Sequence, residues 1–280
     1  MAVARVFDRS EEETRTIADE AEARAALGDD YHMNGQPRVY LLDLEGTVAP
    51  LSLVTEQLFP YARRHLEPYL RAQVREPWIE AELAADLMLL AEENAAEDGA
   101  AGAPLLTRPG EDESWESMVP QAAAYLLWLM DRDRKSTALK SLQGRVWREG
   151  FESGALVGTV FADVPLALER WSKRARVAIY SSGSVEAQRL LFQYSSAGDL
   201  TPYIAAHFDT RVGAKGNSSS YQRIAESMAV RPQEVLFFSD AVQELDAARE
   251  AGCQTRLVAR PGNAAVAEHK HPVIRGMDSE

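Results

Sequence analysis

Two acidic residues follow a short apolar segment near the start of the chain. The segment Val39–Leu42 runs directly into Asp43, and Glu45 comes two residues later. A continuous apolar run is typical of a buried parallel strand, and open α/β sheets bind their ligands just beyond the carboxyl ends of such strands. Carboxylates at positions i and i+2 of an extended chain share one side of it. The pair therefore predicts a site where a nucleophile, a proton and a metal ion are handled together.

Further polar residues follow two other expected elements. Ser181 and Ser182 come after a strand at 177–180 and before a helix at 185–194, where small hydroxyls and backbone N–H groups are suited to binding a phosphoryl group. Lys215 lies in the loop before a helix at 220–228. Its ammonium can offset the charge of a phosphate and of a nearby carboxylate.

A fourth strand end adds two acids. Asp240 follows the strand at 235–238, and Glu244 comes four residues later. Asp240 can coordinate a hard cation directly, whereas Glu244 can hold a metal-bound water or orient Lys215 from a second layer. Taken singly, each of these groups is more often a helix cap or a solvated charge. Their order along the chain favours a magnesium site that faces a small phosphate pocket.

The elements that position these residues form an alternating pattern with one long interruption. Residues from about 54 to 150 contain no convincing strand, and helical apolar spacing covers 56–71, 78–96 and 122–147, with an exposed loop at 97–116. From residue 163, helices (164–174, 185–194, 220–228, 245–251) alternate with strands (177–180, 207–208, 235–238, 255–258). The pattern predicts an α/β fold, a doubly wound parallel sheet with an all-helical cap inserted after its first strand.

Three regions follow from this organisation. We expect a loose polar extension at 1–36, an α/β core formed by 37–54 and 151–280, and a helical cap at 55–150. The cap is expected to close over the site and exclude water.

Composition excludes several kinds of partner. The 280 residues carry a net charge of −13, which argues against binding nucleic acid or an anionic membrane surface. Cys253 is the single cysteine, so no intramolecular disulfide forms, and we expect a packed thiol. Neither a signal peptide nor a membrane-spanning stretch is seen, and the cytoplasm is the expected location.

The four strand-end groups resemble the motifs of the haloacid dehalogenase-like hydrolase superfamily. Within it, the chain resembles the enolase-phosphatase family of methionine salvage, also called acireductone synthases, from about Val39 to the C-terminus. Glu45, where most of the superfamily carries Asp, and the pair Ser181-Ser182 point to this branch. The other matching segments are 42–47, 58–63, 180–188, 260–263, and in the cap 135–140, 142–144 and Trp147.

The resemblance implies a role for each acid. Asp43 would be the nucleophile that accepts the phosphoryl group and would also bind Mg²⁺, one ion per subunit. Glu45 would join the metal site and act as an acid/base, and Asp240 would complete the metal site. Glu244 is implied only as a second-layer residue.

The remaining roles concern the substrate. Ser181 and Ser182 would hold the phosphate or the dicarbonyl oxygens, and Lys215 would stabilise phosphoryl charge and contribute to catalysis. The family's substrate is a small phosphorylated diketone, and we expect a monomer. Val48 and Asn217 depart from the family pattern, which has a second Thr and a Glu at these positions, and we expect altered rate or substrate tuning rather than inactivity.

The implied reaction is the magnesium-dependent enolisation of 2,3-diketo-5-methylthiopentyl 1-phosphate, followed by dephosphorylation to the acireductone, 1,2-dihydroxy-3-keto-5-methylthiopentene. Two alternatives stay open. One is a phosphatase of the same fold for another small organic or sugar phosphate, because fold alone does not determine substrate. The other is a non-catalytic module that only binds phosphate.

Some aromatic and histidine residues have two interpretations. Tyr61, Trp147 and Phe151 are predicted to be cap core rather than the wall of a methylthio pocket, because aromatic residues at helical spacing usually bury for stability. His269 and His271 are expected to be solvated loop residues, and no zinc site is predicted.

Overall fold

The structure is a computed structural model that describes residues 36–74, 79–97, 102–110, 114–265 and 268–280. It contains a six-stranded parallel sheet in the order β3-β2-β1-β4-β5-β6. Its strands are β1 (Val39–Leu42), β2 (Arg176–Tyr180), β3 (Ala206–Phe208), β4 (Val235–Ser239), β5 (Gln254–Val258) and β6 (Val273–Ile274). This confirms the predicted parallel sheet. Strand β6 was not predicted, because two residues are too few to produce a pattern in the sequence.

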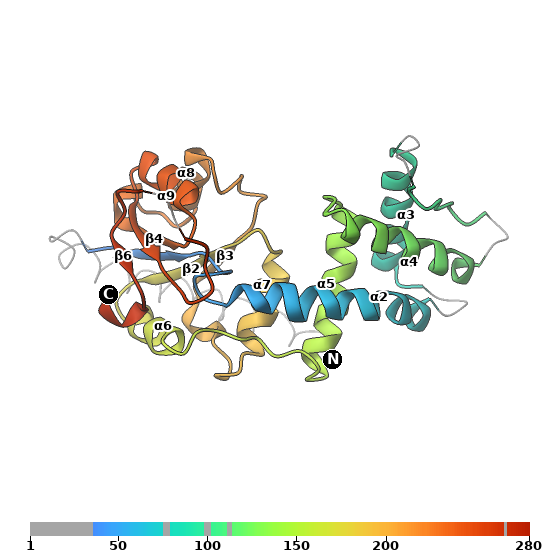
Figure 1. The fold of residues 1–280 in the computed structure, drawn as a ribbon, viewed down its shortest axis with the longest axis horizontal. Helices are drawn as coiled ribbons and strands as arrows, with labels where there is room; N and C mark the ends of the chain where they lie inside the picture. Colours follow the sequence, from blue (N-terminus) through green and yellow to red (C-terminus); the bar gives the residue numbers. More distant parts are fainter. Residues whose placement is uncertain (1–35, 75–78, 98–101, 111–113, 266–267) are drawn as a thin grey trace, which may run out of the picture.

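The first strand lies in the middle of the sheet, and alternation of its side chains decides what covers each face. Tyr40 and Leu42 point into the cluster that contains Trp171 of α6 (Val164–Ser172), and α7 (Val185–Gln193) contributes to the same cluster. Val39 and Leu41 point into the opposite cluster with α8 (Ser218–Ser227) and α9 (Val242–Glu250). Figure 1 shows α8 and α9 above the strands and α6 below them. Burial on both faces explains the continuous apolar run.

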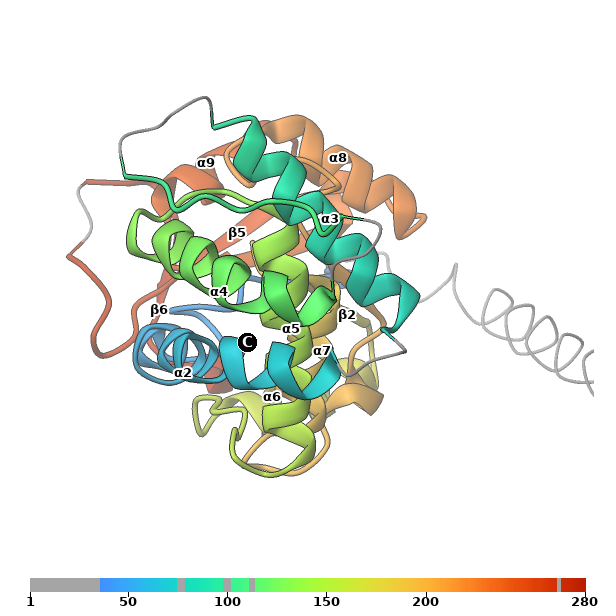
Figure 2. The ribbon, with the colours of Figure 1, turned by 90° about the vertical axis from the view of Figure 1, so that its right-hand side faces the viewer.

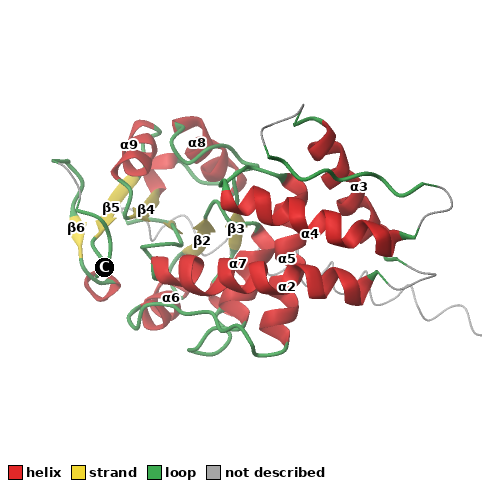
Figure 3. Cartoon of the chain, turned by 45° about the vertical axis from the view of Figure 1, so that its right-hand side comes forward, coloured by secondary structure: helices red, strands yellow, loops and turns green. Residues whose placement is uncertain are grey.

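A helical insert, defined here as residues 53–152, separates β1 from β2 in the chain. It consists of the π-helical turn η1 (Leu53–Leu58) and the helices α2 (Phe59–Gln73), α3 (Ala81–Ala95), α4 (Trp115–Asp131) and α5 (Thr137–Glu152). These helices pack on one another beside the sheet, and α5 also packs on α7 (Figures 2 and 3). None of the described helices is long and apolar enough to cross a bilayer.

The segment expected as one helix at 122–147 is two helices. The chain turns between α4 and α5, where Asp133 has a φ of 48° and the Ser136 side chain caps α5 by accepting a hydrogen bond from Leu139 N at 2.9 Å. Both helices bury apolar residues in the same cluster, so the hydrophobic spacing continues across the break. Periodicity therefore could not reveal the turn, although Ser136 is a typical N-cap residue.

The loop expected to be exposed at 97–116 is partly buried. Leu106 is only 4% exposed, and the Asn94 side chain of α3 fixes its backbone by accepting a hydrogen bond from Leu106 N and donating one to Pro104 O. Residues 98–101 and 111–113 of this loop, and the first 35 residues of the expected N-terminal extension, lie outside the described part.

The prediction of solvated histidines was wrong for His271. It is 4% exposed, its Nδ1 lies 2.8 Å from the Thr255 hydroxyl of β5, and its Nε2 lies 3.2 Å from Asp246 Oδ1 of α9. The ring links a strand to a helix, a role that no local pattern indicates. Cys253 is buried as predicted, and burial raises the pKa of its thiol to about 12.

Gly158 packs closely against the backbone at the C-terminal end of α7. Its N–H donates to Tyr194 O at 2.8 Å, and a Cβ at this position would lie 2.0 Å from Leu191 O, a backbone atom. We expect Gly158→Ala to lower the free energy of unfolding by about 2 kcal/mol, because the backbone must shift to admit the methyl group. Urea denaturation measures this.

Gly144→Ala is the matched control. A Cβ at Gly144 in α5 would meet only Glu186 Oε2, at an ordinary 3.9 Å. We expect this variant to be unchanged or more stable by up to about 1 kcal/mol, because alanine favours a helix. Equal effects of the two substitutions would contradict the proposed clash.

Candidate active site

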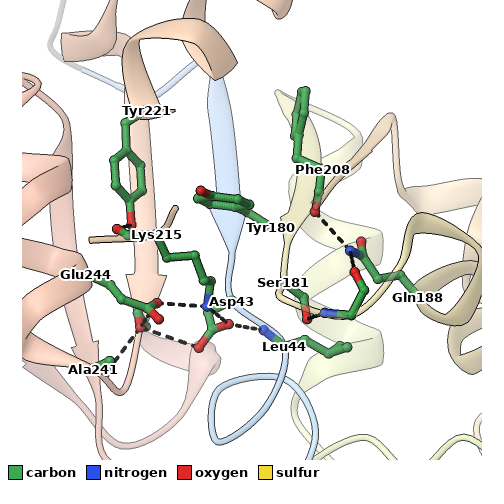
Figure 4. A network of polar contacts seen from close by, with 12 residues as sticks. Asp43, Leu44, Tyr180, Ser181, Gln188, Phe208, Lys215, Tyr221, Ala241 and Glu244 are labelled. Carbon is green, nitrogen blue, oxygen red and sulfur yellow. Dashed lines mark hydrogen bonds and ion pairs between the residues drawn. The ribbon is translucent and has the colours of Figure 1, made fainter. Parts of the chain in front are cut away.

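Asp43 lies at the carboxyl end of the central strand. Its N–H donates to Phe238 O of β4 at 2.9 Å, which continues the ladder one residue past β1. The side chain is buried, and its Oδ1 accepts a hydrogen bond from Leu44 N at 2.7 Å. Lys215 Nζ forms an ion pair with the same oxygen (Figure 4). A carboxylate is therefore held at the centre of the sheet edge by a cation and a backbone N–H.

Lys215 is shared between two acids from different elements. Its Nζ pairs with Asp43 and also lies 2.8 Å from Glu244 Oε2 of α9 (Figure 4). The backbone carbonyl of Lys215 accepts a hydrogen bond from the Tyr221 hydroxyl at 2.7 Å. The Ser239 hydroxyl lies 3.0 Å from Glu244 Oε2 and 3.4 Å from Asp43 Oδ2, so it donates to one of these acids. Glu244 thus contacts Lys215, as one of the two roles predicted for it requires.

Asp240 sits against the turn that follows Asp43. Gly46 has a φ of +75°, and a Cβ on it would lie 2.3 Å from Asp240 Oδ2. Only glycine leaves room for the carboxylate and adopts this backbone conformation without strain. The Asn263 side chain donates to Gly46 O at 2.9 Å. The turn between Glu45 and Thr47 is therefore where Asp240 meets the backbone of the first loop.

A buried arginine supports the same turn from below. Arg260 Nε donates to Thr47 O at 3.1 Å, and its Nη1 lies 2.9 Å from both oxygens of Asp163. Asp163 also accepts a hydrogen bond from Met277 N. In the sequence, the segment 260–263 is known only from its resemblance to the family. The structure shows that its side chains hydrogen-bond to the backbone of the turn at residues 46 and 47.

The two paired serines in the loop between β2 and α7 differ in exposure to solvent. Ser181 is fully buried, and its Oγ accepts a hydrogen bond from Gly183 N at 3.0 Å (Figure 4). Ser182 is exposed. The Gln188 side chain donates to Gly183 O at 3.0 Å and to Phe208 O at 2.9 Å, so it fastens this loop to the end of β3. Sequence reasoning gave Gln188 no role.

The site contains more carboxyl groups than cations to neutralise them. Burial raises the pKa of Asp43, an effect that Lys215 opposes and Glu244 reinforces. Burial also raises the pKa values of Glu45 and Asp240, again with a contribution from Glu244. Burial disfavours the Lys215 ammonium, but Asp43 and Glu244 outweigh it and raise the pKa of Lys215. One ammonium thus faces four carboxyl groups.

This excess of carboxylate fits a hard divalent cation. Asp43, Asp240 and the Glu45 region offer oxygen ligands, which Mg²⁺ prefers, and the charge of the ion would offset their mutual repulsion. No three His, Cys, Asp or Glu side chains lie in a metal-binding arrangement among the described residues. A metal ion here would therefore use fewer side chains and complete its shell with a backbone carbonyl or water, as Mg²⁺ commonly does.

A cleft of about 1550 Å³ opens between the helical insert and the ends of the strands. Ser182, Ser184 and Ala214 line it on the sheet side. Apolar residues of the insert line the opposite side: Phe59, Leu129, Met130 and Leu139. Ala214 directly precedes Lys215, so the sheet side of the cleft adjoins the loop that carries this lysine.

The chain matches known proteins along most of its length. Residues 37–252 match the model of the haloacid dehalogenase-like hydrolases. A relative from Synechococcus elongatus, named "Enolase-phosphatase E1", is 49% identical over 227 residues, which cover 81% of this chain and 90% of the relative. A Danio rerio protein of the same name is 41% identical over 242 residues, covering 85% and 91%.

This chain belongs to the enolase-phosphatase E1 family of haloacid dehalogenase-like hydrolases. Its fold agrees with the crystal structure of the UTR4 protein from Saccharomyces cerevisiae, which is 35% identical, has a TM-score of 0.68, and matches over 88% of this chain and all of the yeast chain. The resemblance stated from the motifs is confirmed, and the chain is a phosphatase enzyme.

The structure of this enolase-phosphatase family member brings some of the predicted residues together directly. Lys215 contacts both Asp43 and Glu244, and Asp240 lies against Gly46 within the same loop cluster. Ser182 instead faces the cleft.

The aromatic residues of the insert lie in the core. Tyr61, Trp147 and Phe151 are buried in the cluster that continues to the sheet, and Trp147 Nε1 donates to Leu58 O at 2.8 Å. None of the three is among the residues described as lining the cleft. Val48 is fully buried in the same cluster, so the missing hydroxyl at this position is replaced by core packing.

Proposed function

We propose that this chain is a magnesium-dependent, bifunctional enolase-phosphatase that converts 2,3-diketo-5-methylthiopentyl 1-phosphate to 1,2-dihydroxy-3-keto-5-methylthiopentene and phosphate. The observation that carries the proposal is the buried Asp43 carboxylate, paired with Lys215 at the central strand end of a chain whose relatives are named enolase-phosphatases. The proposed place of the reaction is L-methionine salvage.

Phosphoryl transfer would proceed in two displacements at Asp43. Oδ1 accepts hydrogen bonds from Leu44 N and Lys215, whereas among the described residues Oδ2 has only the 3.4 Å contact with the Ser239 hydroxyl. Oδ2 is therefore the oxygen that would attack phosphorus. The bond between phosphorus and the substrate oxygen breaks, that oxygen leaves with a proton, and an aspartyl phosphate forms. Water then attacks phosphorus, which releases phosphate and restores the carboxylate.

Enolisation would need a base near the diketone. Glu45 is partly exposed and follows the nucleophile by two residues, and burial and neighbouring acids raise its pKa, which makes its carboxylate more basic. We assign it to remove the carbon-bound proton and to protonate the leaving oxygen later. Lys215 and the Ser181-Ser182 loop would hold the phosphoryl group.

The proposed magnesium ion would be held by the Asp43 and Asp240 carboxylates and by the backbone carbonyl of Glu45, which leaves the Glu45 carboxylate free to act as the base. When bound, it would polarise a substrate oxygen and offset charge between the phosphate and the carboxylate. We further propose that the chain acts as a monomer in the cytoplasm.

Residues 55–150 are proposed to form the cap of this enzyme. Both proposed boundaries fall within elements, since η1 starts at Leu53 and α5 ends at Glu152. The apolar side of the cleft, including Leu129 and Met130, would accept the methylthio tail.

Parallel recording of enol absorbance and phosphate release, with Mg²⁺ and after chelation by EDTA, tests the proposal. We expect an enol signal that precedes phosphate release, and loss of phosphate release without Mg²⁺. Phosphate release from this substrate with no enol intermediate, together with faster turnover of a sugar phosphate, would support the alternative phosphatase. Tight substrate binding without either product would support the non-catalytic module.

A further inference from the structure

Most cations that line the cleft are neutralised by neighbouring carboxylates. Arg63 pairs with Asp131 at 2.5 Å, Arg134 with Glu97 at 2.8 Å, and Arg211 with Asp209 at 3.0 Å. Lys135 and Lys140 also line the cleft, and neither forms an ion pair with another described residue. The absence of an ion pair therefore does not by itself show which of these two lysines contacts an anionic ligand, and their contacts with the core decide it.

Lys140 is the one of the two that reaches the core. It lies in the first turn of α5, and its Nζ donates to the backbone carbonyl of Ser182 at 2.8 Å. An ammonium has three N–H donors and no acceptor. With one donor on the Ser182 carbonyl, Lys140 retains two for a ligand held by the Ser181-Ser182 loop.

The position of this ammonium is set by the packing of two helices. Arg148 of α5 forms an ion pair with Glu186 of α7 at 2.6 Å. Gly144, between Lys140 and Arg148 in sequence, faces the same Glu186 side chain. The Ser184 side chain caps the same helix α7 by accepting a hydrogen bond from Ala187 N at 3.2 Å. Lys140 thus contacts the loop directly before the N-terminus of α7, two residues ahead of the cap residue Ser184.

Electrostatics at the neighbouring loop agree with this placement. Burial would raise the pKa of Asp209, but hydrogen bonds from Arg211 outweigh it and lower the pKa, and Lys140 contributes in the same direction. Lys140 therefore lies within electrostatic range of the loop that leads to Lys215, without a carboxylate of its own.

We propose that Lys140 is a substrate-contacting residue that the helical insert supplies to the phosphate site, where its ammonium binds an outer oxygen of the phosphoryl group. The inference rests on the proposed function for the identity of the site, and it extends that function by naming a contact from outside the α/β core. It also means that α5 must stay packed on α7 for the phosphate site to be complete.

The test compares Lys140→Met, Lys140→Arg and Lys135→Met in the full chain. Methionine retains the length of the lysine side chain and removes its charge. We expect Lys140→Met to raise KM for the diketone phosphate and for p-nitrophenyl phosphate by about tenfold, and to weaken inhibition by inorganic phosphate by a similar factor, since a charge-assisted hydrogen bond is lost. Lys140→Arg should recover most of both losses.

Lys135→Met is the matched control, because Lys135 lines the same cleft but makes no described contact with the core. We expect its KM and phosphate inhibition to stay within about twofold of the parent chain. If Lys140→Met raised KM for the diketone alone and left phosphate inhibition unchanged, the proposal of a phosphate contact would be wrong. Because inorganic phosphate and p-nitrophenyl phosphate report on the site directly, this result is independent of whether the diketone is the true substrate.

Discussion

Asp43→Asn is expected to stop phosphate release, with kcat lower by on the order of 10³-fold or more, equivalent to about 4 kcal/mol of transition-state stabilisation. The amide keeps the size of the side chain and can still accept a hydrogen bond from Leu44 N, but it is too weak a nucleophile to take the phosphoryl group. Steady-state phosphate release measures the loss. Acid quenching of the parent enzyme during turnover, followed by mass spectrometry, should place a phosphoryl group on Asp43.

The control for this substitution is Asp131→Asn. Asp131 is also paired with a cation, Arg63, but both side chains are about half exposed and both belong to helices of the insert, α2 and α4. We expect its kcat within about twofold of the parent value, because exposed ion pairs contribute little. Full turnover by Asp43→Asn would falsify the role of Asp43 as the nucleophile.

Lys215→Met is expected to remove activity and to lower the free energy of unfolding together. Lys215 is mostly buried and bonds to both Asp43 and Glu244, with side-chain exposures of 11%, 4% and 19%. Removing the ammonium leaves the two facing carboxylates without the cation that they share, which costs on the order of 3 kcal/mol. We expect a fall in kcat of about 10³-fold, because the charge on the phosphoryl group is no longer offset. Urea denaturation and phosphate release measure the two effects.

Magnesium provides a second measurement on the same variant. A divalent cation that binds only the folded state stabilises it, and the variant, with one positive charge fewer among the acids, should gain more stability from Mg²⁺ than the parent chain does. The control is Lys173→Met, which breaks an exposed pair with Glu169 in α6 and should change stability by less than about 0.5 kcal/mol. Equal stabilities of Lys215→Met and the parent chain, with and without Mg²⁺, would contradict the shared-ammonium interpretation.

Local sequence was enough to locate the strand ends and the residues that follow them. The run Val39–Leu42 is buried on both faces, and such strands are apolar throughout, so the position of Asp43 at a strand end was readable. The alternation of helices and strands after residue 163 determined the parallel sheet, because parallel strands require crossovers. The order of Asp43, Ser181, Lys215 and Asp240 then indicated the superfamily, and Glu45 with the Ser181-Ser182 pair indicated the narrower family.

Contacts between distant segments were not readable from local patterns. Asp43 and Lys215 are separated by 172 residues, and nothing near either one shows that Lys215 bonds to Asp43 and Glu244 at once. The same limit applies to Asn263 on Gly46, to Arg260 on Thr47, and to the buried His271. Each of these contacts is a hydrogen bond that forms only when whole helices and strands pack together. Such a bond produces no periodic pattern in the sequence.

The sequence by itself thus determined the class of the fold, the family, and which side chains stand at the strand ends, since strand burial and residue order are local properties. The tertiary structure decided which of these side chains form ion pairs or hydrogen bonds with one another, and which helix of the insert packs beside them. Lys140 illustrates the difference. In the sequence it is one lysine among several in a helical segment, and only the packing of α5 on α7 places its ammonium on the Ser182 carbonyl.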